Sequence, residues 1–377
     1  ALPMKFVVER SLLLDALQRT ARIAVRPSDK NLVAILTHVK LETRKPSGLR
    51  LTAHDLFREV EILVPTADIS KTGVTTMSAR ALLDFVASCP EGAQVEIEHP
   101  RADARVVVRA GRARATLPAL SADDFPAFTV PGNAVSFEIE GAAYSAGLAS
   151  VAHAQSSEET RYYLNGIFVH RRKERELVCV ATDGHRIART IVPMAEDLPE
   201  DLPGVIVPSA AIGELIGLAG KVDTLQIEVS DQFLRARTES VTFTTKLVDG
   251  TYPDYERVLP PDDVATGFDT DRTAFAQTAR RCAAIVSDKA RAVKLTPRGD
   301  TLELLGSDRD LGEIVDEIDA ATSTKMPVGL NTKYLVAALE ALQGKTVKVR
   351  YDNPGAPIAF TDPGEPNRLQ VVMAMRV

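Results

Sequence analysis

The sequence has few cysteines and no long apolar run, and both deficits narrow the class of protein. Cys89, Cys179 and Cys282 are far apart, odd in number, and outside any CxxC or Cys/His spacing. Neither a disulfide framework nor a zinc site is therefore expected, and a reducing cytoplasm fits best. No apolar stretch is long enough to span a bilayer, and the one at residues 6–8 is too short for a signal peptide.

Recognisable catalytic motifs are lacking as well. The chain has no HExxH, GxSxG or Walker A sequence, and the GKT at residues 344–346 lacks the upstream glycine of a phosphate loop. In ATDGHR, Asp183 and His185 are both able to bind metal or carry protons, but two polar neighbours are weak support for a reaction. His185 in a locally hydrogen-bonded turn is the alternative. No catalytic residue, metal or cofactor is predicted.

Size and composition indicate an ordinary globular protein. The 377 residues suggest two or three domains, and 45% hydrophobic with 25% charged residues is the usual balance of a soluble chain. The net charge of -6 argues against a protein that coats nucleic acid with its whole surface. A localised basic face remains compatible with it.

A threefold repeat emerges from the apolar pattern. Apolar residues at i, i+3, i+4 and i+7 predict an amphipathic helix, and this spacing occurs three times. The residues are Leu82, Phe85, Val86 and Cys89, then Ile212, Leu215, Ile216 and Ala219, then Leu335, Ala338, Leu339 and Leu342. An earlier helix repeats at intervals of 131 residues in the pairs Leu13 and Leu17, Tyr144 and Leu148, and Phe275 and Ala279.

A third landmark lies between the two helices of each repeat. It is a strand that ends in a turn with an aspartate, at Asp55, Asp183 and Asp308. Period-two alternation follows the second helix, which predicts half-buried antiparallel strands. Pro and Gly cluster at residues 125–133 and 258–263. We expect an α+β chain with three topologically similar domains at residues 4–128, 133–258 and 262–377.

Three tandem domains suggest a ring. Unpaired sheet edges invite pairing, and a head-to-tail contact between copies either closes or grows a filament. Basic residues outnumber acidic ones in residues 9–26 and 271–291, so a positively charged lining can attract phosphates without reading bases. The alternative is that these arginines form a solvated helix face.

Several separated segments resemble one family. RYYLNGIFVH and ATDGHRI within residues 161–187, KLVDGTYPDYERVLP at 246–260, MKFVVERSLLLDALQ near the start and VVMAMRV at the end are similar to signatures of the bacterial DNA sliding clamp, the beta subunit of DNA polymerase III. The resemblance covers essentially the whole chain from Met4. It implies three DNA-clamp domains with helices lining the inside and antiparallel sheets outside, in a head-to-tail dimeric ring around double-stranded DNA.

The resemblance also implies a non-catalytic processivity factor in the cytoplasm. A hydrophobic pocket would receive short linear peptides from the replicative polymerase, the clamp loader and repair proteins, which flexible methionines help to accommodate. The matching positions are Leu164, Thr182, Gly184, His185, Arg186, Ile187, Pro253, Arg257, Val258, Val371, Val372, Met373, Met375 and Arg376. Ala374 departs from the proline common in the family.

The same resemblance implies two further surfaces. Arg26, Arg161, Tyr162 and Tyr163 match DNA-contacting positions, although core packing is an equal alternative for the tyrosines. At the subunit contact, Leu117 would meet Ile285 and Val286, with Arg112 or Arg114 near Asp308, Asp310 or Glu313. A repeat-built scaffold that binds proteins without encircling DNA is the competing function.

Overall fold

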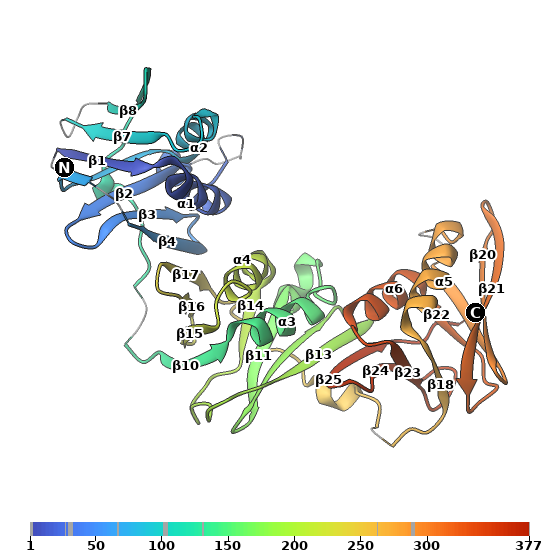
Figure 1. The fold of residues 1–377 in the computed structure, drawn as a ribbon. Helices are drawn as coiled ribbons and strands as arrows, with labels where there is room; N and C mark the ends of the chain where they lie inside the picture. The colour runs from blue at the N-terminus through green and yellow to red at the C-terminus, as the bar shows by residue number, and fades with distance from the viewer. Residues whose placement is uncertain are drawn as a thin grey trace. The chain divides into compact units, whose positions relative to one another are not determined.

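The computed structural model describes residues 3–26, 28, 33–65, 68–100, 105–129, 132–261, 263–287 and 291–376. The chain forms two compact units (Figure 1). Unit 1 contains Ala1–Glu138 with Thr224–Lys246, and unit 2 contains Ile139–Asp223 with Leu247–Val377. Parts of the predicted linkers at residues 130, 131 and 262, of the basic segment at 288–290, and residue 377 lie outside the described residues.

Two α-helices belong to each repeat in the described part of the chain. They are α1 (Arg10–Ile23), α2 (Ala79–Ser88), α3 (Gly141–Ala152), α4 (Ser209–Ala219), α5 (Arg272–Ile285) and α6 (Thr332–Ala341). The first helices of the repeats begin 131 residues apart, and the two helices of each repeat pack against each other. The predicted threefold repeat is confirmed.

The predicted apolar stripes face the cores. All six residues of the first-helix pairs, such as Leu13 and Leu17 in α1, are at most 1% exposed. On the second helices, Phe85 and Ile216 are only half-buried. Burying a large apolar side chain stabilises a fold by about 1.5–3 kcal/mol, so these stripes hold the helices in place. Side chains of Glu9, Ser78, Asp271 and Asn331 cap the starts of four helices.

Antiparallel strands make up most of the remaining structure. The first repeat contributes β1 (Met4–Glu9), β2 (His38–Arg44), β3 (Gly48–His54), β4 (Arg58–Val64), β5 (Asp68–Lys71), β6 (Val74–Ser78), β7 (Gln94–His99), β8 (Val106–Ala110) and β9 (Ala113–Leu117). The second contributes β10 (Val135–Glu140), β11 (Gly166–Lys173), β12 (Glu176–Thr182), β13 (Arg186–Pro193), β14 (Val205–Pro208), β15 (Thr224–Val229), β16 (Phe233–Arg237) and β17 (Val241–Lys246). The third contributes β18 (Gly267–Asp271), β19 (Ala292–Arg298), β20 (Thr301–Asp308), β21 (Gly312–Thr322), β22 (Val328–Asn331), β23 (Thr346–Arg350), β24 (Ile358–Asp362) and β25 (Glu365–Val372).

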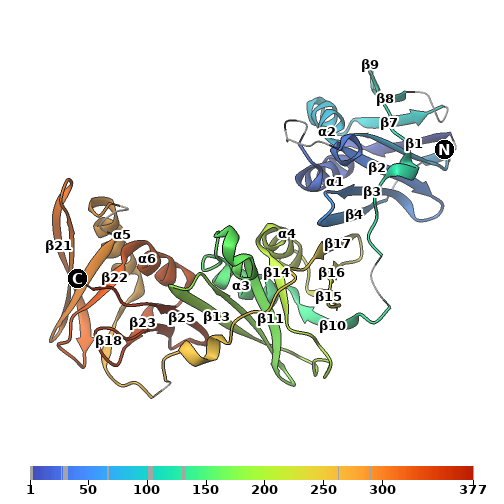
Figure 2. The same cartoon turned by 180° about the vertical axis from the view of Figure 1, so that it is seen from behind.

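Short 3-10 helices occupy several connections, namely η1 (Ala34–Thr37), η2 (Ala122–Asp124), η3 (Glu159–Leu164) and η4 (Tyr255–Val258). In unit 2, helix α3 packs on strands β11–β13, α4 packs on β11 and β14, and α5 packs on β20 and β21. Both views show the four helices of unit 2 along one side of its strands (Figures 1 and 2). The second unit is therefore a helix layer on a sheet.

Sheets continue from one repeat into the next at two places. In the eight-stranded sheet of unit 1, β4 pairs with β17, with Arg58 opposite Thr245. In the twelve-stranded sheet of unit 2, β13 pairs with β25, with Arg186 opposite Val372. The β4–β17 pairing attaches the last strands of the second repeat to unit 1. The two compact units consequently do not follow the three repeats.

The three predicted aspartate landmarks form the same turn. In each, one carboxylate oxygen of Asp55, Asp183 or Asp308 accepts hydrogen bonds from the backbone N–H groups two and three residues later. The donor–acceptor distances run from 2.6 Å to 3.1 Å. A short acidic side chain is suited to this local bonding, which explains why the sequence keeps aspartate at each strand end.

Three structural observations concern membrane spans, metal sites and the cysteines. Among the described residues, no helix is both long and apolar enough to cross a membrane. Across the same residues, no group of three or more His, Cys, Asp or Glu side chains is arranged to hold a metal ion. The three cysteines are buried and free of disulfides. Burial raises the pKa of the Cys282 thiol to about 11, so it stays protonated at neutral pH.

Candidate functional sites

The β12–β13 turn gathers several of the predicted peptide-binding residues. The Thr182 hydroxyl donates to the Arg186 carbonyl at 2.6 Å and accepts from the Gly184 N–H at 3.1 Å. Gly184 has a φ of 88°, a conformation that favours glycine. The Met373 N–H, just beyond β25, donates to the His185 carbonyl at 2.9 Å. Segments almost two hundred residues apart in sequence are thereby joined at one surface.

An apolar cluster lies under this turn. Leu164, Ile187 and Val371 belong to it and are 4%, 8% and 2% exposed. Tyr252 and Tyr255 pack in the same cluster, and the sequence reasoning did not select them. They lie on either side of Pro253, which was predicted, in the KLVDGTYPDYERVLP segment. The sequence alone could therefore have indicated them. Burial raises the pKa of Tyr255 to about 12.

The rim of this surface is exposed. Val258 at the end of η4 is 50% exposed, and Met373 is 40% exposed. Pro253 is exposed beside them in the chain, and the exposed Arg257 pairs with Asp254 at 2.7 Å. Buried apolar side chains next to exposed ones form a surface that rewards apolar anchors on a partner. We call the β12–β13 turn, this cluster and its rim the peptide surface.

The C-terminal segment packs against the core of the third repeat. The Met375 N–H donates to the Gly329 carbonyl at 2.8 Å, while Arg376 is exposed. Val372 is 1% exposed and packs in the third repeat's core, on the opposite face of β25 from Val371. Alternation along the strand produces this division. Ala374, where the family commonly has proline, also packs against that core.

Arg186 is held by partners on three sides. Its Nε donates to the Asp183 carboxylate at 3.0 Å, and its guanidinium lies 4.4 Å from the centre of the Tyr334 ring. Its Nη1 lies 3.4 Å from His153, and burial, with help from this charge, lowers the pKa of that imidazole. Asp183 serves two backbone N–H groups and one guanidinium. It therefore has a structural role in the ATDGHR turn.

Tyr334 is a second residue that sequence reasoning missed. It lies on α6 and stacks on His185 with ring centres 6.4 Å apart. Tyr334 also lines a hollow of about 190 Å³ with Lys333 and Val286. In the sequence, Tyr334 is recognisable only as the residue before Leu335 of the apolar helix pattern. That pattern does not predict its contact with a turn in another repeat.

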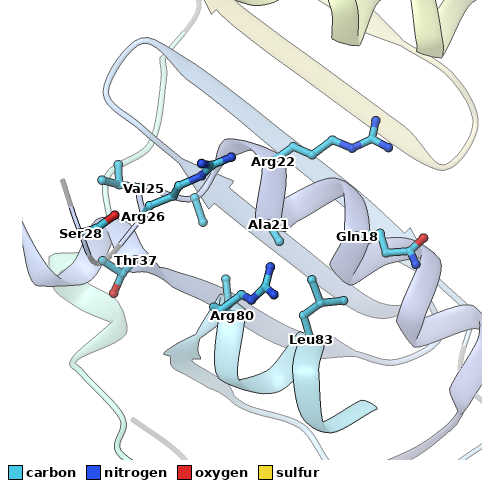
Figure 3. A pocket seen from close by; sticks show the side chains of 11 residues that line it. Gln18, Ala21, Arg22, Val25, Arg26, Ser28, Thr37, Arg80 and Leu83 are labelled. Atoms are coloured by element: carbon cyan, nitrogen blue, oxygen red, sulfur yellow. The ribbon is translucent and has the colours of Figure 1, made fainter. Parts of the chain in front are cut away.

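The predicted DNA contact Arg26 lies beside other arginines. Arg26 follows α1, Arg80 belongs to the first turn of α2, and both line one hollow of about 910 Å³ in unit 1 (Figure 3). Arg22 and Gln18 of α1 line it too. Arg80 is paired with Asp84 at 3.0 Å. Several guanidinium groups around one open surface are suited to phosphate oxygens.

The other three predicted DNA residues lie in η3 of unit 2. Arg161 pairs with Glu158 at 3.3 Å, which offsets part of its charge. Tyr162 is 53% exposed, whereas Tyr163 packs against the apolar cluster of the peptide surface. The two rings meet edge to face with centres 5.7 Å apart. Tyr162 is thus the more exposed of the two tyrosines.

The predicted subunit-contact residues of unit 1 lie at a sheet edge. Leu117 ends β9, which is the outer strand of the order β5-β1-β7-β8-β9. Leu117 is half-buried, and Arg112 and Arg114 are exposed. Such an edge presents backbone groups to another strand, with positive charge beside it.

The matching residues of unit 2 lie near the third aspartate turn. Val286 is 9% exposed and Ile285 is half-buried at the end of α5. The Asp308 carboxylate accepts from the backbone N–H groups of Ser287 and Asp310. Hydrogen bonds from the Ser287 hydroxyl and from the Asp310 backbone lower the Asp308 pKa to about 2. Asp308 is therefore used inside unit 2, and Asp310 is exposed.

Comparisons with known families and proteins agree over the whole chain. Models of the DNA polymerase III beta subunit match three segments, the N-terminal domain at residues 4–129, the central domain at 138–254 and the C-terminal domain at 256–376. A beta sliding clamp of Caulobacter vibrioides is 34% identical over 99% of this chain and 100% of its own. One from Escherichia coli K12 is 32% identical with the same coverage.

Solved structures are similar as well. A Caulobacter crescentus beta sliding clamp, with PEG bound to a putative beta-motif tethering region, has a TM-score of 0.93 and 33% identity over 100% of this chain and 99% of its own. A Bartonella birtlesii sliding clamp bound to griselimycin has a TM-score of 0.92 and 32% identity over 100% of both chains.

Proposed function

Because the chain belongs to the DNA polymerase III beta subunit family, the beta sliding clamps, we propose that two copies form a closed ring around double-stranded DNA. In this ring the helices face inward and the sheets outward. The ring tethers a replicative polymerase, a clamp loader and repair proteins through short peptides. Tethering replaces bimolecular rebinding with a high effective concentration, which raises processivity without catalysis.

One feature of the strand pairing supports a head-to-tail dimer. β4 and β13, the strands after the first two aspartate turns, each pair with the last strand of the following repeat, β17 and β25. The strand after the third turn is β21, and within the described residues its stretch Gly312–Asp319 pairs only with β20. The last strand of the first repeat is the edge strand β9. Pairing β21 of one copy with β9 of another repeats the same join.

Charge and apolar contact support this join. Arg112 precedes β9 and Arg114 lies within it, while Asp310 precedes β21 and Glu313 lies at its start, and all four are exposed. Opposite charges across paired strands are favourable, and Leu117 can then meet Ile285 and Val286. Two such contacts related by symmetry close the ring with six domains. We place the domains at residues 4–128, 133–258 and 262–377, and the linkers and three family matches support these boundaries.

Two further surfaces complete the proposal. Arg26, Arg161, Tyr162 and Tyr163 contact the duplex, and phosphate contacts that repeat along the helix permit sliding. The peptide surface binds apolar anchors of partner peptides between Leu164, Val258 and Met373. The clamp acts in the cytoplasm as a non-catalytic subunit, and no residue of the peptide surface is assigned a reaction.

A retention experiment tests the ring. The protein is loaded onto nicked circular DNA by its clamp loader, and the circle is then linearised. A topological ring stays on the circle and leaves the linear ends, so retention should be lost on cutting. Retention on free linear ends, or none on the circle, contradicts encirclement. Replacing Arg26 and Arg80 together with alanine should weaken the salt-sensitive binding of the unloaded protein to linear duplex DNA, while retention on the intact circle persists.

A further inference from the structure

The β3–β4 turn of unit 1 has the same backbone frame as the β12–β13 turn of the peptide surface. Asp55 bonds to its following N–H groups as Asp183 does. The Lys246 N–H, at the end of β17, donates to the Phe57 carbonyl at 2.8 Å, as Met373 does to His185 at 2.9 Å. The next residue after each aspartate has a positive φ, 75° at Leu56 and 88° at Gly184. Position by position, the two junctions correspond.

The side chains at these equivalent positions are apolar and exposed. Leu56 is 44% exposed and Phe57 is 66% exposed. Behind them Phe128 and Phe233 have ring centres 5.0 Å apart, and both are half-buried. We call Leu56, Phe57, Phe128, Phe233 and Lys246 the Phe57 patch. Contiguous exposed apolar side chains mark an interaction site more often than scattered ones do.

The conformation of Leu56 supports a role for its side chain. A branched residue at positive φ costs free energy that glycine avoids, and the second repeat has glycine at this position. The Leu56 N–H donates to His54 Nδ1 at 2.8 Å, which helps to hold the turn. A strained turn therefore holds two adjacent large apolar residues at the surface. Elsewhere among the described residues, Val258 and Met373 are exposed at the peptide surface, and Leu311 is exposed beside the proposed β21 join.

Charge indicates what the patch accepts. The Lys246 ammonium is exposed and lies 5.5 Å from the centre of the Phe57 ring and 5.7 Å from that of Phe128. Within the described part of the chain, Lys246 pairs with no carboxylate. Arg58 is paired with Asp55 at 2.7 Å, so its charge is already offset. The patch therefore offers a cation beside aromatic rings to an incoming acidic group.

We infer that the Phe57 patch binds a short peptide in which an acidic residue stands beside a leucine or an aromatic residue. The analogy with the peptide surface rests on the proposed function, whereas all the residues of the patch lie in unit 1. Compared with the peptide surface, Phe57 replaces His185 and Lys246 replaces Met373. The second site therefore selects acidic–apolar peptides, and a ring of two copies carries two such sites.

The absence of tryptophan from the chain makes a direct test possible. Phe57→Trp keeps an aromatic ring and introduces a single tryptophan, which can be excited selectively, into the full-length protein. The probe is the capped peptide Gly-Asp-Glu-Leu-Phe-Gly, and its matched counterpart carries two lysines in place of the acidic pair. A saturable blue shift with the acidic peptide, and at least a tenfold weaker response to the lysine peptide, is expected. Leu12→Trp, at a residue 45% exposed in the same unit, should give no shift.

Two further variants identify the site. Lys246→Glu in the Phe57→Trp background should weaken binding at least tenfold. Removal of residues 373–377 should leave the shift at position 57 unchanged. No shift, or a shift that disappears with that truncation, overturns the inference. If the Phe57→Trp variant does not fold, calorimetric titration with the acidic peptide tests the same binding. The truncated chain is then compared with and without Phe57→Asp, which should weaken the binding.

Other occupants and the proposed function give separate results. A blue shift that grows with protein concentration in the absence of peptide assigns the patch to a second copy and overturns the inference. A failure of the ring would appear as lack of retention on circular DNA. That failure would leave the titration at position 57 unaffected.

Discussion

The junctions β4–β17 and β13–β25 are built on one backbone frame and present different chemistry. Both have an aspartate turn, a positive φ at the next residue and a carbonyl that accepts a backbone N–H from the end of the neighbouring strand or just beyond it. One presents Leu56, Phe57 and Lys246, and the other presents Gly184, His185 and Met373. Main-chain hydrogen bonds thus fix where a surface forms. We propose that the residues at these three positions set what each surface binds.

The largest effect should come from removing residues 373–377. This deletes Met373 with its bond to His185 and the bond between Met375 and Gly329. Affinity for a polymerase-derived peptide should fall at least about a hundredfold, because the rim and the ordering of the turn are lost together. Fluorescence anisotropy measures it, and sedimentation should still find a dimer. Lys246→Ala, the equivalent change at the other junction, should leave this affinity unaltered, and an unchanged affinity in the truncation rejects the peptide surface.

Leu117→Asp tests whether β9 and β21 form the same join between copies. In the proposed join, the variant places a carboxylate against Ile285 and Val286 and beside the acidic start of β21. The dimer dissociation constant should rise at least about tenfold, since burying an unpaired charge is costly. Mass measurement across dilution provides the readout. Leu120→Asp, at a residue 39% exposed just beyond β9, is the matched control, and equal effects of both variants count against the join.

Glu59 supplies a pH-dependent difference between the junctions. It is 5% exposed, follows Arg58 in β4, and stands where the second junction has Ile187. Burial, reinforced by Glu61, raises the pKa of Glu59 from 4.5 to about 7. The folded state therefore holds a proton that the unfolded state releases above its own pKa. Stability falls as pH rises from about 4.5 to about 7, and the full cost remains above that range.

Glu59→Gln should remove this cost. The variant should be more stable than the parent by about 1–3 kcal/mol at pH 8, with a much smaller difference near pH 4.5. Urea unfolding followed by circular dichroism at both pH values measures it. Glu138→Gln, at an exposed glutamate of unit 1, is the control. Equal gains at both pH values would assign the effect to packing.

The smallest effects should distinguish the two positive-φ residues. Leu56→Gly relieves backbone strain but increases the entropy of the unfolded chain, so the net change should stay within about 1 kcal/mol. Gly184→Ala should destabilise by about 1–2 kcal/mol because it adds a Cβ at a φ that favours glycine. That Cβ would lie 2.8 Å from Arg161 Nη1, whose flexible side chain can move away. Thermal unfolding compares them, and equal losses would remove the contrast in strain.

Much of the fold was predictable from local pattern. The pairs Leu13 with Leu17 and Phe275 with Ala279 are buried as their helical spacing predicts, and all three aspartates lie in the expected turns. The sites were less predictable. Tyr334 contacts His185 and Arg186 from another repeat, and Phe128 of the linker packs at a tilt against His54 with ring centres 4.4 Å apart. Neither contact has a periodic signal.

The family resemblance identified residues of the peptide surface, but it did not predict which way their side chains point. Leu164, Ile187 and Val371 meet in one cluster, whereas Val372 lies in the core of the third repeat. Asp308 is also turned inward, onto the loop after α5. Strand register and loop packing determine such directions, and both depend on residues distant in the chain.

The sequence by itself determined the helices and the aspartate turns, because each depends on residues within a few positions of one another, and their recurrence at similar intervals revealed the threefold repeat. Tertiary structure alone decided that β17 joins β4 and that β25 joins β13. It also placed Lys246 beside Phe57 and Met373 beside His185. Contacts between strands this far apart are selected by shape and burial over the whole fold, and local spacing does not encode them.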